Sequence, residues 1–427
     1  NQWQVASLQP PHLAAICVWE GAADMYRDLS HHGGILCDFI KNWYDMQVKT
    51  VQYGLGKRGP KSRVTGQPVC GDVTLSDAQL KANREDFGAA ALKHALDDEY
   101  WKSRMPDWSK VKVPVFSAAN WGGQGLHPRG NFEGFVRAAS KNKWLEAHGI
   151  EHWTHFYTDY GRELQLRFFD HFLHGKKNGW NRQPKVQLQV RHIDKFVQRS
   201  EGEWPLKRTK WTKFYLDPVQ LTLGKKAPAS TAKVSYKGFS DGVTFMLPPQ
   251  AEDIEITGPS ALKLFLSSST RDADIFAVLR VFTPDLKEVV FQGALDPHTP
   301  VGQGWLRASH RALDPKLSKP YRPYHPHDKV EPLKPGQVVE LDVEILPTSI
   351  VVPAGYRIAL TVRGKDYEYP GPAGVLSNMK YPMTGCGPFT HTDPTDRPAR
   401  VFDGVNTLHS GPAKASYLML PIIPKRK

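Results

Sequence analysis

The segment KWLEAHGIEHW, residues 143–153, concentrates side chains that could do chemistry. His148, Glu151 and His152 form an H-x-x-E-H pattern, which binds zinc when both imidazoles lie on one face of a helix. Here Gly149 and Ile150 follow directly on a strand-like run, which disfavours a helix. We therefore expect no metal and place His152 in the loop after the strand. A histidine there has either a structural role or that of a general base.

One G-x-S-x-G pattern occurs, at residues 238–242. In a nucleophile elbow the serine of this pattern lies on a sharp turn between a strand and a helix. The runs on both sides of Ser240, residues 234–236 and 243–248, are strand-like, and no helical pattern follows. The pattern therefore predicts an ordinary β-turn rather than a catalytic serine.

The first 183 residues alternate between strand-like and helical segments. Apolar runs at 13–19, 111–120 and 143–149 predict buried strands, and residues 130–140 and 160–175 have helical spacing. Alternation with short connections is typical of parallel strands covered by helices. This part of the chain therefore predicts an α/β layer.

Two other segments differ from this alternation. Residues 31–105 are aromatic and helical, with Ser76 a suitable N-cap for one helix. From Pro184 on, short alternating runs are separated by Pro, Gly and Asp turns, which predicts an all-β sandwich of the jelly-roll kind. The expected organisation is α/β core at 1–30 and 106–183, helical insertion at 31–105, and β-sandwich at 184–427.

Composition narrows the class of protein. The 427 residues are 40% hydrophobic and 23% charged, as in ordinary globular proteins, and no apolar run is long enough to span a membrane. The net charge of +13 comes from scattered basic residues without a nucleic-acid-binding motif. The four cysteines are too scattered for a disulfide framework or a metal motif. We expect a cytoplasmic protein with reduced thiols and with neither a nucleic-acid nor a membrane partner.

Several segments resemble one family of serine hydrolases. The opening residues, with Gln-Trp-Gln at 2–4 and Asp-Met-Tyr-Arg at 24–27, resemble the stretch after the nucleophile elbow in the cocaine esterase (CocE/NonD) and X-Pro dipeptidyl-peptidase (S15) family. Residues 167–180 resemble its last catalytic-domain helix, and GWLRASHR, residues 304–311, resembles part of its jelly roll. The resemblance implies an α/β-hydrolase core with a helical cap and a C-terminal jelly-roll β-sandwich. It also implies that the nucleophilic serine lies just before Asn1 and that the chain is truncated at its N-terminus.

The resemblance implies roles for two members of a catalytic triad. Its chain order of serine, acid and histidine makes His152 the general base, with His155 in reserve. The acid is expected after the strand that ends near Asn120, where the sequence has no carboxylate. Three alternatives stay open: Glu133 or Glu151 supplies the acid, Asn120 orients the imidazole as a neutral partner, or strong activity has been lost.

The implied reaction is hydrolysis of an ester, amide or X-Pro peptide bond through an acyl-serine, without a cofactor. The alternative is a degenerate hydrolase that acts as a binding module. Without the nucleophile, this chain alone is expected to be inactive. The implied partner is a small ester or amide or a short peptide, and a homodimer is left open.

The resemblance also implies a substrate pocket under the cap. Phe39, Trp43 and Tyr44 are candidates to line it, although aromatic residues on helices also pack in cores. Asp24 and Glu20 lie near the carboxyl end of a predicted strand. They could bind a substrate amine if the enzyme is a dipeptidyl-peptidase, or serve as structural ion-pair partners.

Overall fold

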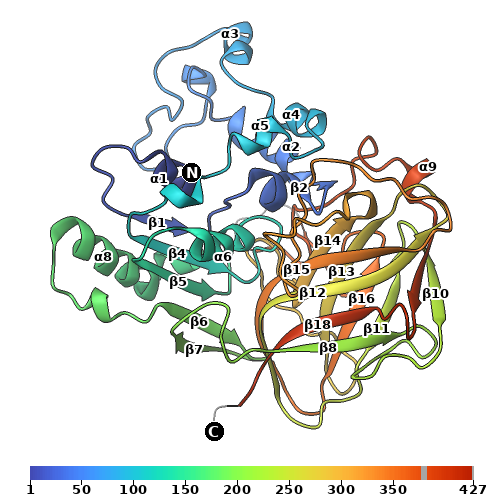
Figure 1. Cartoon of the computed structure of the whole chain (residues 1–427). Helices are drawn as coiled ribbons and strands as arrows, with labels where there is room; N and C mark the ends of the chain where they lie inside the picture. The colour runs from blue at the N-terminus through green and yellow to red at the C-terminus, as the bar shows by residue number, and fades with distance from the viewer. Residues whose placement is uncertain (377–381, 426–427) are drawn as a thin grey trace.

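The computed structural model describes residues 1–376 and 382–425. A mixed α/β part comes first in the chain and a predominantly β part follows, in the order predicted (Figure 1). In Figure 1 the segment between β1 and β4 lies above the α/β part and next to the β part. None of the helices within the described residues is long and apolar enough to cross a membrane.

Four parallel strands form the sheet of the α/β part. They are hydrogen-bonded in the order β1 (Ile16–Trp19), β4 (Val115–Asn120), β5 (Lys143–His148) and β6 (Val186–Arg191). All six residues of β4 are buried, which explains its continuous apolar pattern. Trp19 pairs with Ala118, and Asn120 pairs with His148. The carboxyl ends of β1, β4 and β5 therefore meet at one edge, where an α/β sheet can present functional side chains.

β6 differs from the prediction. Its sequence was expected to belong to the β-sandwich, yet Val186 pairs in parallel with Leu145 of β5. β7 (Phe196–Glu201) then pairs antiparallel with β6, and one pair, Arg191 with Ile350, joins β6 to the β part. Alternate residues of β6 are half-buried, so its hydrophobic period matches that of a sandwich strand.

Helices cover both faces of this sheet. Val115 and Ala119 face the side of α1 (Gln2–Leu8) and α6 (Pro128–Arg137), where Trp3 and Phe132 complete the packing. Phe116 and Ala118 face the side of α8 (Asp159–His174) and pack against Phe168. Short helices lie at the loops, namely α7 (Thr154–Tyr157), η4 (Trp108–Lys110) and η5 (Trp180–Arg182).

The segment between β1 and β4 forms several short elements instead of long helices. They are η1 (Met25–Ser30), β2 (His31–His32), β3 (Ile35–Leu36), α2 (Phe39–Trp43), η2 (Tyr44–Val48), η3 (Gly56–Arg58), α3 (Asp77–Ala82), α4 (Phe87–Lys93) and α5 (Glu99–Lys102). Ser76 caps α3 through a capping box with Gln79, as predicted. Asp86 and Asp98 cap α4 and α5, and these caps divide the predicted helical stretch into separate helices.

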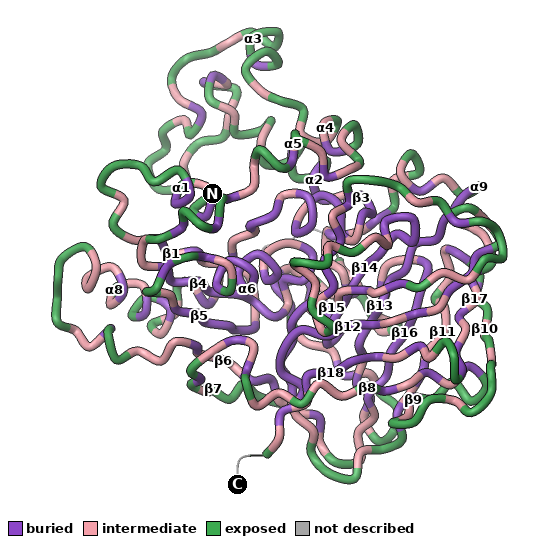
Figure 2. The backbone as a smooth tube through the Cα atoms, in the orientation of Figure 1, coloured by how far each residue is buried: buried purple, intermediate pink, exposed green. Residues whose placement is uncertain are grey.

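The β part contains long antiparallel strands. They are β8 (Lys210–Asp217), β9 (Thr222–Gly224), β10 (Ala232–Lys237), β11 (Val243–Met246), β12 (Ile254–Ser268), β13 (Asp274–Phe282), β14 (Gly302–Arg307), β15 (Val339–Val352), β16 (Arg357–Arg363), β17 (Val405–Ser410) and β18 (Tyr417–Ile423), with η6 (Ala308–His310) and α9 (Ala399–Phe402). Figure 2 shows the buried backbone gathered along these strands, and a large apolar core lies between them. Ser240 lies between β10 and β11, and its hydroxyl donates to the Lys237 carbonyl. The β-turn prediction for residues 238–242 is therefore confirmed.

Candidate active site

Glu20 projects its carboxylate over the carboxyl edge of the parallel sheet. It follows the last residue of β1, and its amide donates to the Ala118 carbonyl at 2.7 Å. Its backbone has φ 48°, in the left-handed region that only a few per cent of non-glycine residues occupy. Only 1% of the side chain is exposed. A carboxylate this buried requires hydrogen-bonding or charged partners.

His152 is one of these partners. It lies in the loop after β5, and its Nδ1 is within hydrogen-bond reach of Glu20 Oε2. Because a carboxylate can only accept, Nδ1 carries the hydrogen and the neutral ring has its lone pair at Nε2. The ring stacks on His127, with centroids 4.9 Å apart and planes 8° apart, and the side chain is 30% exposed. His152 thus has the tautomer and partial exposure that a general base needs.

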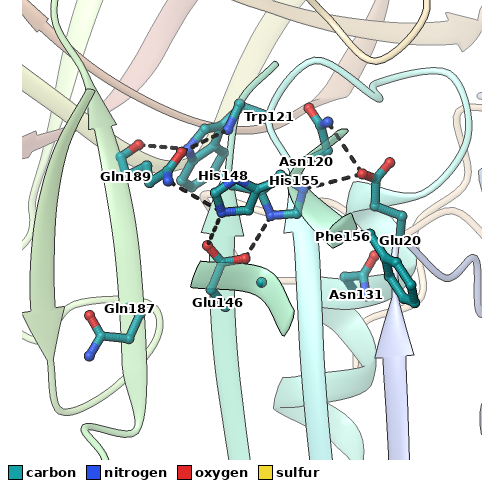
Figure 3. Close-up of polar contacts among 12 residues, drawn as sticks. Glu20, Asn120, Trp121, Asn131, Glu146, His148, His155, Phe156, Gln187 and Gln189 are labelled. Carbon is teal, nitrogen blue, oxygen red and sulfur yellow. Dashed lines mark hydrogen bonds and ion pairs between the residues drawn. The ribbon is translucent and has the colours of Figure 1, made fainter. Parts of the chain in front are cut away.

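His148 is the second partner of Glu20. Its Nε2 lies 3.2 Å from Glu20 Oε1, and its Nδ1 lies 2.6 Å from Glu146 Oε2. All three of these side chains are essentially inaccessible to solvent. Figure 3 shows the imidazole of His148 between the two carboxylates. Glu146, His148, Glu20 and His152 thus form one chain of alternating acidic and imidazole groups.

Burial and the neighbouring ionisable groups act in opposite directions on the pKa values of Glu20, His148 and His152. Burial disfavours ionisation of Glu20, but hydrogen bonds from His148 and His152 outweigh it and lower the Glu20 pKa to about 2. Burial also disfavours a charged His148, yet contacts with Glu146 and Glu20 raise its pKa to about 9. The pKa of His152 is raised too, because its contact with Glu20 outweighs the desolvation of the ring. Glu20 is therefore a carboxylate at neutral pH.

Asn120 supports both Glu20 and the loop that carries His152. Its Nδ2 donates to the Ile150 carbonyl at 2.8 Å and to Glu20 Oε1 at 3.3 Å, and its Oδ1 accepts from the Gly122 amide. Ile150 has φ 64°, which is a genuine outlier for a β-branched residue. Strained backbone of this kind clusters at functional sites. Asn120 therefore positions the acid and the loop, and it makes no contact with His152.

The other predicted acids lie elsewhere. Glu133 on α6 forms an ion pair with Arg322 at 2.6 Å. Glu151 accepts a hydrogen bond from Thr154 at 2.7 Å. The reserve base His155 approaches Glu146, with Nε2 3.7 Å from Oε1. The structure thus brings Glu20, and not Glu133 or Asn120, against the predicted base.

The predicted pocket residues occupy three different environments. Phe39 is buried and packs on Phe389, with ring centroids 4.9 Å apart. Tyr44 lines a cavity of about 260 Å³ together with Leu36, Cys37, Ile40 and Leu92, among others. Trp43 is 39% exposed. Tyr44 is therefore the one of the three predicted residues that lines this cavity.

Asp24 is not available to a substrate amine. It forms an ion pair with Arg27 at 2.8 Å and accepts from the Tyr26 amide, and its side chain is buried. Arg27 also pairs with Asp97. These contacts fit the second alternative for Asp24, a structural ion-pair partner.

Two buried groups of residues bring potential metal ligands within 4.8 Å of one another: Glu146 with His148 and His155, and His32 with Cys37 and His391. In the first group, His148 Nδ1 and Glu146 Oε2 are only 2.6 Å apart, closer than two ligands about 2.1 Å from a tetrahedral zinc can lie. In the second, His32 Nδ1 and His391 Nε2 share a hydrogen bond of 2.9 Å. These donors are paired with one another, and residues 148–152 do not lie on one helix. We assign neither group as a metal site.

The start of α1 lies beside this site. The amino group of Asn1 is among the charges that lower the pKa of His127, after burial and His152. His127 in turn stacks on the ring of His152. Within residues 1–376 and 382–425, no serine, threonine or cysteine is hydrogen-bonded to His152. The amino end of α1 is thus close enough to His127 to act on it electrostatically.

The sequence analysis placed His152 in the loop after the strand, but it did not predict the contacts that link Glu146, His148, Glu20 and His152. The period of a strand places residues i and i+2 on one face, so Glu146 and His148 could have been recognised as a buried pair. Glu20 was noted for its place at a strand end, but 132 residues separate it from His152. No local spacing signals such a contact.

Comparisons with known proteins agree with this architecture. The family model described as X-Pro dipeptidyl-peptidase (S15 family) matches residues 1–157. The model described as X-Pro dipeptidyl-peptidase C-terminal non-catalytic domain matches residues 178–419. A crystal structure of a CocE/NonD family hydrolase from Staphylococcus aureus superimposes with a TM-score of 0.84 at 30% identity, over 99% of this chain and 69% of that one.

Curated relatives point the same way. The chain is 26% identical, over 87% of its length, to a Streptomyces avermitilis protein that provisionally bears the name Xaa-Pro dipeptidyl-peptidase. It is 24% identical, over 61% of its length, to cocaine esterase from a Rhodococcus strain. The matches span 62% of the Streptomyces protein and 46% of the esterase. The fold and these matches together establish that the chain belongs to the CocE/NonD hydrolase and X-Pro dipeptidyl-peptidase (S15) family.

Proposed function

We propose that this chain carries the base and the acid of a serine hydrolase, with His152 as the base and Glu20 as the acid. The observation that supports the proposal most is the contact of His152 Nδ1 with the buried, ionised carboxylate of Glu20. A carboxylate in this position holds the imidazole in one tautomer and stabilises the imidazolium that forms during catalysis. The membership of the family adds the reaction class.

The nucleophile in this proposal is a serine on a segment that precedes Asn1 in the full-length protein. Two observations support this: the amino group at the start of α1 acts electrostatically on His127, which stacks on His152, and residues 1–157 match the S15 family model. In an α/β-hydrolase the nucleophile lies on the turn that leads into a helix. The domain division then follows the resemblance, with core at 1–30 and 106–183, cap at 31–105 and jelly roll at 184–427, except that β6 pairs with β5 and so belongs to the parallel sheet of the core.

The proposed reaction is acyl transfer. Nε2 of neutral His152 takes the hydroxyl proton as the serine oxygen bonds to the acyl carbon, and Glu20 stabilises the resulting imidazolium. The imidazolium then gives this proton to the leaving alcohol or amine as its bond to the acyl carbon breaks. Water, activated by the same ring, cleaves the acyl-serine and frees the serine. No cofactor enters this reaction.

The substrate class is an ester, an amide or an X-Pro peptide. Relatives of this chain carry the names of both an esterase and a dipeptidyl-peptidase. Glu20 and Asp24 are already committed to His152 and Arg27, so we do not assign either one to a substrate amine. A degenerate hydrolase was considered because no carboxylate follows β4, and Glu20 removes that reason.

The decisive experiment is labelling of the full-length gene product with a fluorophosphonate, which reacts covalently with an activated serine. We expect labelling of the wild type and loss of labelling in His152→Ala. Glu20→Gln should slow labelling strongly, since a neutral partner for the catalytic histidine lowers kcat by about 10⁴ in a serine protease. Residues 1–427 alone should not label.

Matched controls separate this arrangement from the alternatives. Glu133→Gln removes a buried glutamate of α6 that pairs with Arg322, and it should leave labelling intact. His155→Ala tests the reserve base and should also leave it intact. Labelling that persists in a folded His152→Ala variant, or that Glu20→Gln leaves at the wild-type rate, would contradict the proposal.

A further inference from the structure

We propose that Glu146 and His148 are positioning residues: as a buried ion pair they hold Glu20 from the side opposite His152 and set how strongly His152 binds a proton. This inference rests on the proposed function, because it concerns the same base and acid. The pair lies outside the serine, base and acid considered above.

The geometry of the strand brings this pair together. Glu146 and His148 alternate on β5 and so share one face of the sheet, and their contact is 2.6 Å long. The His148 carbonyl accepts from the Trp121 amide at 2.7 Å, and Trp19 lies against the His148 ring with centroids 5.4 Å apart. Backbone and packing thus fix the ring in the orientation shown in Figure 3.

With Glu146 and Glu20 both ionised, hydrogen-bonding capacity requires His148 to be an imidazolium. Burial raises the pKa of Glu146, and the contact with His148 opposes that rise. Each ring nitrogen of His148 faces a carboxylate oxygen, Glu146 Oε2 on one side and Glu20 Oε1 on the other. A neutral imidazole has a single N–H, so one buried carboxylate oxygen would then face a lone pair. The cationic form donates to both carboxylates and compensates part of their charge. Contacts with Glu146 and Glu20 raise the His148 pKa to about 9, in agreement.

Other titratable groups lie near Glu146, His148, Glu20 and His152. They are His127 at the start of α6, His155 on α7, Tyr160 on α8 and the amino group of Asn1. Burial, followed by His152, lowers the pKa of His127 to about 3, and burial, followed by His148, lowers that of His155 to about 4. Burial raises the pKa of Tyr160. The two imidazoles and the phenol are therefore neutral near pH 7, and burial lowers the pKa of the Asn1 amino group. The charges that shift the pKa of His152 are those of Glu20 and His148, and Glu146 acts on His152 through His148.

His148 and His152 therefore compete for one carboxylate. The positive charge of His148 lowers the pKa of His152, whereas Glu20 raises it. Without the charge of Glu146, His148 would lose most of what keeps it protonated, and Glu20 would act on His152 alone. Glu146→Gln should therefore raise the His152 pKa and make this base fully protonated, and so inactive, up to a higher pH.

The test is an NMR titration of the ring nitrogens of ¹⁵N-histidine-labelled chain 1–427, with His148 and His152 assigned through single His→Gln variants. In Glu146→Gln we expect the His152 pKa to rise by about one pH unit or more, the size expected when a nearby buried charge is removed. In the control Glu133→Gln it should not move. An unchanged His152 pKa in folded Glu146→Gln would overturn the inference.

A second measurement needs no variant at Glu146. In the wild type at pH 7, both ring nitrogens of His148 should carry hydrogen, and a neutral His148 would overturn the inference even if Glu146→Gln did not fold. The titration does not depend on the nucleophile. Failure of fluorophosphonate labelling would therefore count against the proposed function alone, and an unperturbed His152 against this inference alone.

Discussion

Replacing Glu20 with glutamine should remove a pH-dependent part of the stability of this fold. The Glu20 pKa is about 2 in the folded protein, against 4.5 for an ordinary glutamate, although burial alone would move it the other way. The ionised form is thus bound more tightly by the folded protein than by the unfolded chain. Glu20→Gln keeps the shape of the side chain and removes that charge.

The size and sign follow from linkage between ionisation and folding. A pKa lowered from 4.5 to about 2 corresponds to about 3 kcal/mol of folding free energy. Because the folded-state pKa is depressed, this stabilisation is complete above pH 4.5 and is lost as the pH falls towards 2. The variant lacks it at every pH, so the difference between the two proteins should be large at pH 6 and smaller at pH 3.

Urea unfolding followed by tryptophan fluorescence at pH 6, 4.5 and 3 measures this difference. Asp45→Asn is the control, because the Asp45–Lys49 pair is about half exposed and such pairs contribute little to stability. The reasoning is refuted if the gap between wild type and Glu20→Gln is the same at pH 3 as at pH 6. It is refuted equally if that gap is no larger than the effect of Asp45→Asn.

Three further results are expected. His148 has a raised pKa of about 9, so the stability that its protonated form contributes is complete below pH 6.5 and is lost as the pH rises through 9. The melting temperature should therefore fall over that range, and it should fall less in Glu146→Gln. Gly122→Ala would put a methyl carbon 2.2 Å from Gly293 Cα and 3.0 Å from Ala294 N, which are backbone atoms, and should cost about 1–3 kcal/mol in urea unfolding. Gly202→Ala meets nothing within 4 Å and should be nearly neutral. Burial raises the pKa of three thiols, and these should stay unreactive towards Ellman's reagent at pH 8 until denaturant is added, namely Cys17, Cys37 and Cys386.

The alternation of strands and helices was predictable because the hydrophobic period records which faces are buried. The buried strands β4 and β5 and the Ser76 cap were read correctly for this reason. The identity of the neighbour with which a strand pairs leaves no such record. β6 alternates like a sandwich strand, and only the three-dimensional structure shows that it extends the parallel sheet.

The place of His152 in the loop after β5 was predictable because it follows a recognisable strand, whereas its contact with Glu20 was not. The resemblance points to the carboxyl end of β4, which lies between β1 and β5, and β4 ends at Asn120. The structure instead has the carboxylate of Glu20 directly after β1, one strand further from His152. Glutamate has one more methylene group than aspartate, and this longer side chain lets the carboxylate reach across the intervening strand.

The amide of Asn120 and the ionised carboxylate of Glu20 are chemically complementary neighbours. The Asn120 amide lies 3.3 Å from Glu20 Oε1 and donates to it, which an aspartate at that position could do only if it were protonated. Two ionised carboxylates that close inside the protein would repel, and one would lose its charge. An amide at position 120 is thus compatible with an ionised Glu20 beside it.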